Sequence, residues 1–330
     1  MKENIKEISG NYSINMVKKA IIISLSGPQL KKEEHNLFKK NIPWGVILFK
    51  RNVKNLNQLK KLILSIRNLT KDNKFPILID EEGGDVSRLQ SIFYNGVYSQ
   101  KFFGDLYEKN PDFGISIYKY YINEICSLFK DLKININTVP VLDKLSKNTN
   151  NFLKTRVYSS KKKTIKTLSK ICIETYKKNK IFTVIKHIPG HGQAKSDSHK
   201  KLPVVNKSKK FLLNNDFDCF KYTKSLFAMT AHVKFTTIDN KHCVTHSKKN
   251  IQNFIREKIK FKGILISDDV GMKSLKYSIL ENALRAISAG CNLALYCDGK
   301  YHVSLKLLKK IPPIDEFTAK KTSEFYKFLR

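Results

Sequence analysis

Residues 181–192 read Ile-Phe-Thr-Val-Ile-Lys-His-Ile-Pro-Gly-His-Gly, an apolar run followed directly by charged and helix-breaking residues. The run 181–185 is typical of a strand that is buried on both faces. Proline and glycine exclude a helix over 186–192, and this part is too polar for a core strand. Asp197, Ser198 and His199 follow within a few residues. The stretch therefore predicts a buried strand that leads into a loop carrying reactive side chains.

Runs of the same kind recur along the chain, with amphipathic stretches between them. The predicted strands are 20–25, 44–49, 76–79, 134–142, 181–185, 226–231, 263–266 and 293–296. Helical spacing of apolar residues predicts helices over 56–66, 118–129, 165–176 and 279–287, the last ended by Gly290. Eight buried strands alternating with helices predict an α/β fold, a (β/α)8 barrel of the TIM type. An open doubly wound sheet is the alternative, but no GxGxxG motif follows the first strand.

The length and composition suit one domain with a substantial core. The chain has 330 residues, of which 41% are hydrophobic. We expect a single barrel domain spanning 1–330, with an N-terminal extension over 1–19 and a helical tail from about 301 to 330. The polar, lysine-rich segment 200–217 is expected to be a surface connection, because no low-complexity linker marks a domain boundary.

The charge balance is strongly basic, with 62 Lys and Arg against 28 Asp and Glu and a net charge of +34. Such a charge can indicate a polyanionic partner, such as nucleic acid or an anionic membrane. The lysines, however, are scattered in pairs and triples, and no aromatic ladder alternates with them. Lys, Asn and Ile are all abundant, as expected from a coding sequence rich in A and T. We favour this compositional explanation and expect no specific nucleic-acid partner; a basic nucleic-acid-binding protein is the alternative of a different class.

The six cysteines and the N-terminus bear on the compartment. No CxxC pair occurs among the cysteines, so neither a zinc site nor a redox motif is indicated, and several lie in apolar runs that suit a reducing compartment. The first residues lack the apolar core of a signal peptide, and the apolar run 20–25 is too short to cross a bilayer. We therefore expect a cytoplasmic protein, monomeric and without membrane contact.

Ionisable residues stand at the ends of five predicted strands. They are Asp80, Asp143, Lys186 with His187, His232, and Asp268 with Asp269. A single Asp after a strand is readily explained as a helix cap or turn former. Five such strand ends are harder to explain in this way, since Lys and His are poor caps. The catalytic groups of a (β/α)8 barrel stand at the C-terminal ends of its strands, so these residues are predicted to meet at one mouth.

Together these motifs resemble those of a known family over residues 20 to about 300. The most specific is Lys186-His187-x-Pro189-Gly190-His191-Gly192 with Asp197-Ser198-His199, supported by the Ile-Asp-Glu-Glu-Gly-Gly of 79–84, the Pro-Val-Leu-Asp of 140–143 and the Ser-Asp-Asp of 267–269. The chain resembles the bacterial β-N-acetylhexosaminidases of glycoside hydrolase family 3, of the single-domain cytoplasmic type used in cell-wall recycling. Asp85, Asn292 and the segment 155–158 depart from the family's pattern.

The resemblance implies a retaining exo-β-N-acetylglucosaminidase that acts on peptidoglycan fragments, including those with anhydro-N-acetylmuramic acid, without a cofactor. Asp268 is implied as the nucleophile, with its neighbour Asp269 as the rival; we expect only one of the two to face the sugar. His199 is implied as the acid/base, oriented and tuned by Asp197. An imidazole is suited to this role because its unperturbed pKa lies near ~6.5.

The remaining roles concern the sugar and the loop. The resemblance implies that Asp80, Arg88, Lys186 and His187 bind the sugar, and Arg156 is carried over as a further binding residue. We expect the loop 188–200 to act as a lid that brings His199 over the sugar, with 189–192 as its hinge and His191 in a structural role. A metal site made of His187, His191 and His199 is disfavoured, because their spacing suits a helix that Pro189 and the glycines exclude.

Two activities of the same family remain as alternatives: a β-glucosidase and an N-acetylglucosaminide phosphorylase. A comparison of glucosides with N-acetylglucosaminides, with and without phosphate, separates them.

Overall fold

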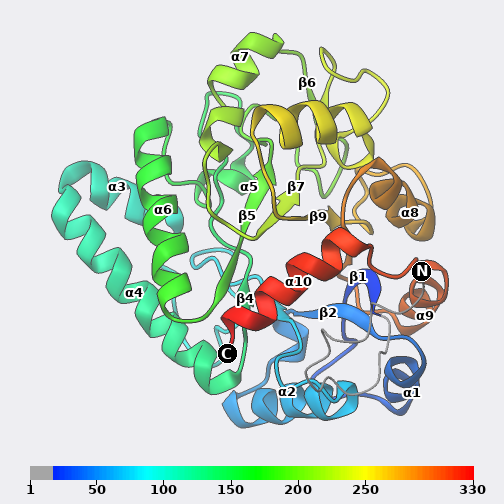
Figure 1. Cartoon of the computed structure of the whole chain (residues 1–330). Coiled ribbons are helices and arrows are strands. Elements are labelled where there is room, and N and C mark those ends of the chain that lie inside the picture. The colour runs from blue at the N-terminus through cyan, green and yellow to red at the C-terminus, as the bar shows by residue number, and fades with distance from the viewer. Residues whose placement is uncertain (1–17) are drawn as a thin grey trace, which may run out of the picture.

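The computed structural model describes residues 18–330, and its centre is a closed barrel of parallel strands (Figure 1). The barrel strands are β1 (Lys19–Ser24), β2 (Pro43–Leu48), β3 (Ile77–Ile79), β4 (Ile136–Asn137), β5 (Phe182–Ile188), β7 (Phe227–Thr230), β9 (Ile264–Asp269) and β10 (Leu293–Tyr296). Strand β1 pairs with β2 on one side and with β10 on the other, which closes the barrel. The predicted (β/α)8 fold is confirmed within the described residues.

Helices surround the barrel and connect its strands (Figure 1). They are α1 (Lys32–Lys40), α2 (Leu56–Thr70), α3 (Gln100–Lys109), α4 (Pro111–Leu132), α5 (Asn151–Lys154), α6 (Lys162–Lys178), α7 (Lys209–Asn214), α8 (Ile279–Ala289), α9 (Tyr301–Lys310) and α10 (Glu316–Phe328). Short 3-10 turns lie at η1 (Lys50–Asn52), η2 (Phe217–Phe220) and η3 (Val244–His246), and η4 (Asn250–Lys258) is a π-helix.

The helix boundaries follow from capping residues. The side chain of Asn55 accepts a hydrogen bond from the main-chain N–H of Gln58 at 2.9 Å, which satisfies a donor at the start of α2. Gly290 ends α8 with a φ of 118°, a conformation that favours glycine because it has no Cβ. The four helices predicted from apolar periodicity are all present, as parts of α2, α4, α6 and α8.

Helix α10 covers the N-terminal end of the barrel (Figure 1). The ring of Phe325 lies 4.9 Å from that of Phe182 and 6.1 Å from that of Trp44. The indole N–H of Trp44 donates to the hydroxyl of Thr322 at 2.8 Å, so this buried polar group is satisfied. Because this end is filled, the strand C-termini at the opposite end are left to form a site.

Several strands differ from their predicted length, β4 and β5 among them. Strand β5 continues beyond the apolar run 181–185, through Lys186 and His187 at its predicted end, to Ile188. Both polar side chains are buried there, and each has an ionic partner that makes burial tolerable. Strand β4 is shorter than predicted; Pro140 lies in the run and has no N–H to donate to a neighbouring strand.

Two segments were predicted to lie outside the barrel core: the N-terminal extension and the connection 200–217. The extension expected over 1–19 lies outside the described residues, apart from Lys18 and Lys19, and Lys19 already belongs to β1. The connection 200–217 contains α7 and the strand β6 (Val204–Val205), which pairs with β8 (Lys234–Phe235). Between residues 18 and 330, no helix has both the length and the hydrophobicity that crossing a bilayer requires.

Candidate active site

A cavity of about 310 Å³ opens at the C-terminal ends of the barrel strands. Its lining includes most of the residues predicted for the site: Asp80, Arg88, Arg156, Lys186, His187, His199 and Asp268. Asp197 does not line the cavity but contacts His199. The side chains come from β3, β5 and β9 and from the loops that follow strands, which is where catalytic groups of this fold stand. The structure therefore gathers the predicted residues at one mouth.

Asp80 stands between two cations at the end of β3. Its Oδ1 pairs with the ammonium of Lys186, and its Oδ2 accepts from Arg88 Nη2 at 2.8 Å. Burial alone would raise the pKa of Asp80, but Lys186 and Arg88 outweigh it and hold that pKa well below its usual value. The hydroxyl of Thr138 also bonds Oδ1. Asp80 is thus an ordered carboxylate that stays charged.

Glu82 forms a second buried ion pair next to the first. Arg156 donates from Nε and Nη2 to the two carboxylate oxygens of Glu82, each at 2.8 Å. Lys186 also pairs with Glu82, so its ammonium joins both carboxylates. Burial opposes the charge on Glu82, but Arg156 and Lys186 still lower its pKa. Sequence reasoning did not assign Glu82, although its place two residues after Asp80 puts both side chains on one face of an extended segment.

Glu81 holds the loop after β3 in a shape that places Arg88 at the mouth of the barrel. Its carboxylate accepts the main-chain N–H groups of Arg88 at 2.7 Å and Leu89 at 2.9 Å. It also accepts from the side-chain amide of Asn95 at 2.7 Å. Glu81 therefore closes the loop after β3 and directs Arg88 back towards Asp80.

His187 is oriented by Asp143 at the end of the fourth strand run. The ring Nδ1 of His187 lies 2.7 Å from Asp143 Oδ2, and the main-chain N–H of His191 donates to Oδ1 at 2.6 Å. Burial would raise the pKa of Asp143, but His187 and His191 lower it below its usual value. The ring of His191 is itself buried, and burial lowers its pKa to about 4, so it is neutral near pH 7. The strand-end pattern predicted that Asp143 lies at the mouth but assigned it no role. The structure shows that Asp143 orients His187.

Asp268 and Asp269 end β9, and both border the cavity. Asp269 Oδ1 accepts main-chain N–H groups of Gly271 at 3.0 Å and Cys297 at 3.1 Å. Within residues 18–330, the Asp268 carboxylate accepts one hydrogen bond, from the N–H of Asp269 at 2.8 Å. Asp269 is engaged by the chain that surrounds it, whereas Asp268 is available to a ligand.

The two carboxylates also differ in charge. Burial, followed by the charge of Asp268, raises the pKa of Asp269 to about 6. Burial acts on Asp268 in the same direction, but the nearby rings of His232 and His187 oppose it and lower the pKa of Asp268 below its usual value. Asp268 is therefore fully ionised at neutral pH, as a nucleophile requires.

His199 and Asp197 form a pair on the loop after β5. Asp197 Oδ1 lies 2.8 Å from His199 Nδ1 and accepts the main-chain N–H of His199 at 2.9 Å. The side chain of His199 is 61% exposed, and its ring packs edge-on against Phe152 at 5.7 Å. Burial of Asp197 is outweighed by its bonds to His199, which lower its pKa. The pair is formed as the sequence predicted, but it stands at the open side of the cavity.

The first part of this loop is fixed to the barrel. The carbonyl of Gly192 accepts from Ser146 Oγ at 2.9 Å and from Thr149 Oγ1 at 2.7 Å. A Cβ on Gly192 would lie 2.0 Å from the carbonyl oxygen of Lys144, so no other residue fits there. These contacts do not favour a hinge at 189–192. The exposed part of the loop begins at Lys195 and contains His199.

A buried carboxylate beneath the loop gives a stability prediction. Asp216 is 1% exposed, and its Oδ2 has no hydrogen-bond partner among the described residues. Burial raises its pKa to about 6, so the folded protein keeps a proton that the unfolded chain releases between about pH 4 and 6. Stability therefore falls as pH rises through this window. Asp216→Asn is expected to raise the free energy of unfolding by up to about 3 kcal/mol at pH 8 and by little at pH 4.

Urea unfolding of wild type and Asp216→Asn at the two pH values measures this effect. Asp131→Asn, at an exposed position on α4, is the matched control and should change stability at neither pH. A stability difference that is the same at both pH values would contradict the account of Asp216.

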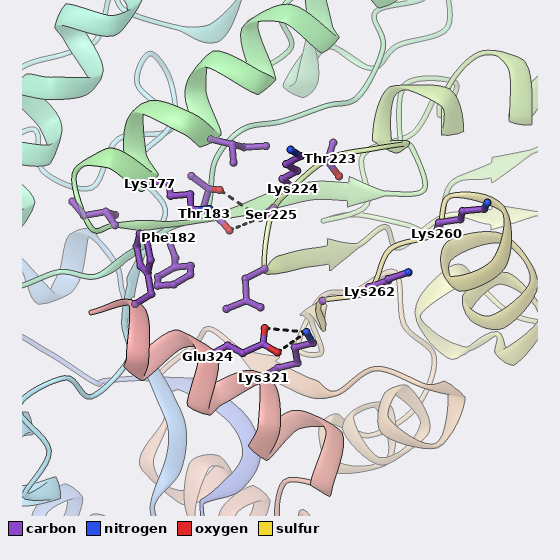
Figure 2. Close-up of a pocket in the computed structure, with 15 residues that line it drawn as sticks. Lys177, Phe182, Thr183, Thr223, Lys224, Ser225, Lys260, Lys262, Lys321 and Glu324 are labelled. Carbon is purple, nitrogen blue, oxygen red and sulfur yellow. Dashed lines mark hydrogen bonds and ion pairs between the residues drawn. The ribbon is translucent and has the colours of Figure 1, made fainter. Parts of the chain in front are cut away.

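A second cavity, of about 390 Å³, lies at the other end of the barrel beside α10 (Figure 2). Its polar rim consists of Lys177, Lys224, Lys260, Lys262, Lys321 and Glu324. Lys321 pairs with Glu324 at 2.8 Å, and Lys260 and Lys262 extend away from the cavity in Figure 2. The lysines do not converge on a point where one anion would sit. This cavity therefore does not indicate a specific polyanion site.

The basic surface still predicts weak, non-specific binding. We expect single-stranded DNA to bind without sequence preference and to dissociate as NaCl is raised from about 50 to about 200 mM, because the attraction depends on counterion release. Fluorescence anisotropy with oligonucleotides of two compositions measures this. Tight binding of one sequence that persists at the higher salt would support a nucleic-acid-binding protein instead.

No metal centre is indicated by the described part of the chain. Within residues 18–330, no group of three His, Cys, Asp or Glu side chains is placed to hold a metal ion. His187 and His191 have ring centroids 5.8 Å apart, but His187 is bonded to Asp143 and His199 to Asp197.

A parallel barrel whose mouth holds an ionised carboxylate, an imidazole–carboxylate pair and fixed cations around one cavity supplies groups that glycoside hydrolysis can use. The comparisons with known proteins agree. Residues 11–318 match the family described as Glycosyl hydrolase family 3 N terminal domain. The chain belongs to this family and is a glycoside hydrolase.

Named relatives cover most of the chain. It is 32% identical to a beta-hexosaminidase of Haemophilus ducreyi over 285 residues, which are 84% of this chain and 81% of the relative. It is 30% identical to a beta-hexosaminidase of Psychromonas ingrahamii over 311 residues, 91% and 89% of the two chains. Among solved structures, NagZ from Neisseria gonorrhoeae in complex with N-trifluoroacetyl-D-glucosamine matches with a TM-score of 0.83 at 24% identity, covering 95% of this chain and 90% of that one. The last comparison supports the fold.

Proposed function

We propose that this protein is a retaining exo-β-N-acetylglucosaminidase that removes terminal, non-reducing N-acetylglucosamine from peptidoglycan fragments. The observation that carries the proposal is that Asp268 and His199 line the same cavity, together with the ordered charges around Asp80. The relatives named beta-hexosaminidase, at about 30% identity, support an N-acetylhexosamine as the sugar. The peptidoglycan fragment, including one that ends in anhydro-N-acetylmuramic acid, rests on the motif resemblance.

Asp268 is the proposed nucleophile. Its carboxylate is ionised and attacks the anomeric carbon, forming a glycosyl-enzyme ester as the bond to the leaving oxygen breaks. Water then attacks the same carbon and releases Asp268. Two displacements at one carbon return the original β configuration, so the reaction retains stereochemistry.

His199 is the proposed acid/base. Asp197 holds Nδ1, so Nε2 is the ring nitrogen that is left to exchange a proton with the substrate. The imidazolium donates this proton to the leaving oxygen in the first step. The neutral ring then takes a proton from the attacking water, which restores the starting state. Asp197 stabilises the charged ring between these events.

The buried charges around Asp80 are proposed to bind the sugar. A carboxylate has about four lone-pair sites, so Asp80 can accept sugar hydroxyls while it stays bonded to Lys186 and Arg88. Arg88, Lys186, His187 and Arg156 supply donors from fixed positions. Because these side chains are already ordered by one another, little further entropy is lost when the sugar binds.

The loop that carries His199 is proposed to close on the sugar. The contacts of Gly192 fix its first part, so the moving part is 195–201. Free and sugar-bound structures would show His199 in different positions. Identical loop positions in both would contradict a lid.

The oligomeric state and the compartment of the enzyme are part of the proposal. We propose that the whole chain acts as one monomeric catalytic domain in the cytoplasm. The six cysteines are free, which suits a reducing compartment. Size-exclusion chromatography with light scattering tests the monomer.

Turnover of a panel of aryl glycosides tests the proposed specificity. We expect the 4-nitrophenyl N-acetyl-β-glucosaminide to be hydrolysed far faster than the β-glucoside, at a rate that does not depend on phosphate. Faster release from the glucoside would identify a β-glucosidase. A rate that requires phosphate, with a sugar 1-phosphate as product, would identify a phosphorylase.

A further inference from the structure

A chain of buried hydroxyls connects the nucleophile strand to a histidine that the proposed mechanism does not use. The main-chain N–H of Asp268 points to Thr230 Oγ1 at 3.3 Å, and Thr230 Oγ1 lies 2.8 Å from Thr245 Oγ1. Thr245 Oγ1 lies 2.7 Å from His232 Nδ1, and His232 Nε2 lies 2.9 Å from the carbonyl oxygen of Asp269. The side chains of Thr230, Thr245 and His232 are all fully buried.

One arrangement of the protons satisfies every group of this circuit with a neutral imidazole. A carbonyl only accepts, so His232 Nε2 must carry a hydrogen and donate to Asp269. At the other end, the N–H of Asp268 donates to Thr230, whose own hydrogen is then free for Thr245. Thr245 in turn donates to His232 Nδ1 at 2.7 Å rather than to the Ala231 carbonyl at 3.4 Å. The imidazole is therefore neutral, with its proton on Nε2.

The circuit fixes the main chain on both sides of the nucleophile. The N–H of Asp268 and the carbonyl of Asp269 flank the peptide that joins the two residues, and both are bonded into the circuit. The Asp269 carbonyl also accepts the N–H of Met272 at 3.1 Å. A shift of Asp268 relative to β7 would break several buried hydrogen bonds together, which is costly.

We propose that His232, acting through Thr245 and Thr230, is a positioning residue that holds Asp268 in line for attack as a neutral imidazole. The inference rests on the proposed role of Asp268. A neutral ring suits this place, because burial removes the hydration of the charged form and lowers the pKa of His232. The charged and titratable groups that face His232 are Asp268 and Asp269 on β9, His187 on β5, His199 on the loop and His246 on η3.

Thr245→Val is the sharpest variant, because valine keeps the shape of threonine and removes the hydroxyl that joins the two halves of the circuit. We expect kcat to fall roughly 10- to 100-fold, since small displacements of a reacting group have effects of this size, while KM changes less than about threefold. Thr245→Ser restores the hydroxyl and should recover most of the loss. A wild-type kcat in a folded Thr245→Val would overturn the proposal.

The matched control is Thr70→Val on α2. Thr70 is also buried and donates its hydroxyl to the carbonyl of Ile66 at 3.0 Å, far from the mouth in sequence and on an outer helix. It should lose a similar amount of thermal stability and keep kcat. Equal losses of kcat in both valine variants would show a general effect of buried hydroxyls and overturn the proposal.

Nitrogen-15 NMR of histidine-labelled wild type tests the circuit without any risk of misfolding. The resonances of His232 are assigned by their loss in His232→Gln. We expect a neutral ring with the proton on Nε2, unchanged from about pH 5 to about pH 8. A proton on Nδ1, or titration within this range, would overturn the proposal.

The proposed function and the proposed role of His232 can fail separately. If Asp268→Ala keeps its activity, the proposed function fails whatever the NMR shows. If Asp268→Ala is inactive while Thr245→Val turns over normally, the nucleophile stands and the role of His232 fails.

Discussion

Asp268→Ala is expected to lower kcat for an aryl N-acetyl-β-glucosaminide by on the order of 10⁴-fold or more, the range found when a covalent nucleophile is removed. The reason is that the ionised carboxylate at the end of β9 is the group that forms the glycosyl-enzyme. The cavity and the charges around Asp80 are untouched by the change, so KM should move much less than kcat.

Azide provides an internal check on this variant. A small anion can enter the space left by the Asp268 carboxylate and attack the anomeric carbon directly. We expect azide to restore part of the turnover and to give the α-glycosyl azide, because a single displacement inverts the configuration. Asp269→Asn keeps the oxygen that accepts from Gly271 and Cys297, and should lose far less activity. The reverse ranking of the two variants would make Asp269 the nucleophile.

His199→Ala is expected to show the second largest effect, and the effect should depend on the leaving group. General acid catalysis contributes about 10²- to 10⁴-fold, but a leaving group that departs readily as its anion needs little of it. We therefore expect a large loss with a disaccharide or a phenyl glycoside and a small loss with a 2,4-dinitrophenyl glycoside. Kinetics across a series of aryl leaving groups measure the slope. Equal losses for good and poor leaving groups would contradict an acid role.

A matched control for His199 is present in the chain. His242 and Asp239 form another partly exposed pair, 3.4 Å apart, that does not line the cavity. His242→Ala should leave every rate in the series unchanged. Because the His199 side chain is largely exposed, His199→Ala is expected to fold with wild-type stability, so its losses report on chemistry.

The barrel could be predicted because its signal is periodic and local. Strands that are buried on both faces appear as continuous apolar runs, and helices such as α2 and α8 carry an apolar stripe and a capping residue at a recognisable end. All eight barrel strands overlap predicted runs. The polar residues that follow the ends of these strands could then be predicted to meet at the mouth.

The sequence was less informative where burial depends on a partner from another strand. Lys186 is too polar for a core strand by local pattern, yet it lies in β5 because Asp80 and Glu82, in the segment after β3, neutralise it. No local pattern shows such a pairing. Glu81 and Glu82 show the same difficulty. They are adjacent and identical, yet Glu81 bonds the main chain of the loop after β3, whereas Glu82 forms a buried ion pair with Lys186.

The site combines a buried half with a more exposed half. The charges around Asp80 and the circuit behind Asp268 are buried and bonded to the barrel. The His199–Asp197 pair stands on the loop after β5, whose first residues are bonded to the barrel and where the side chain of His199 is exposed. A rigid nucleophile and sugar site with a mobile acid would let the substrate enter before the proton donor arrives.

The central claim is that the sugar becomes covalently attached to Asp268, and trapping that intermediate tests it most directly. A fluorinated N-acetylglucosaminyl fluoride slows the second step, so the adduct accumulates and can be located by peptide mass spectrometry. We predict one sugar per chain, attached to Asp268 and lost again when the enzyme reactivates. A label on Asp269 or elsewhere, or inactivation with no adduct at all, would contradict it.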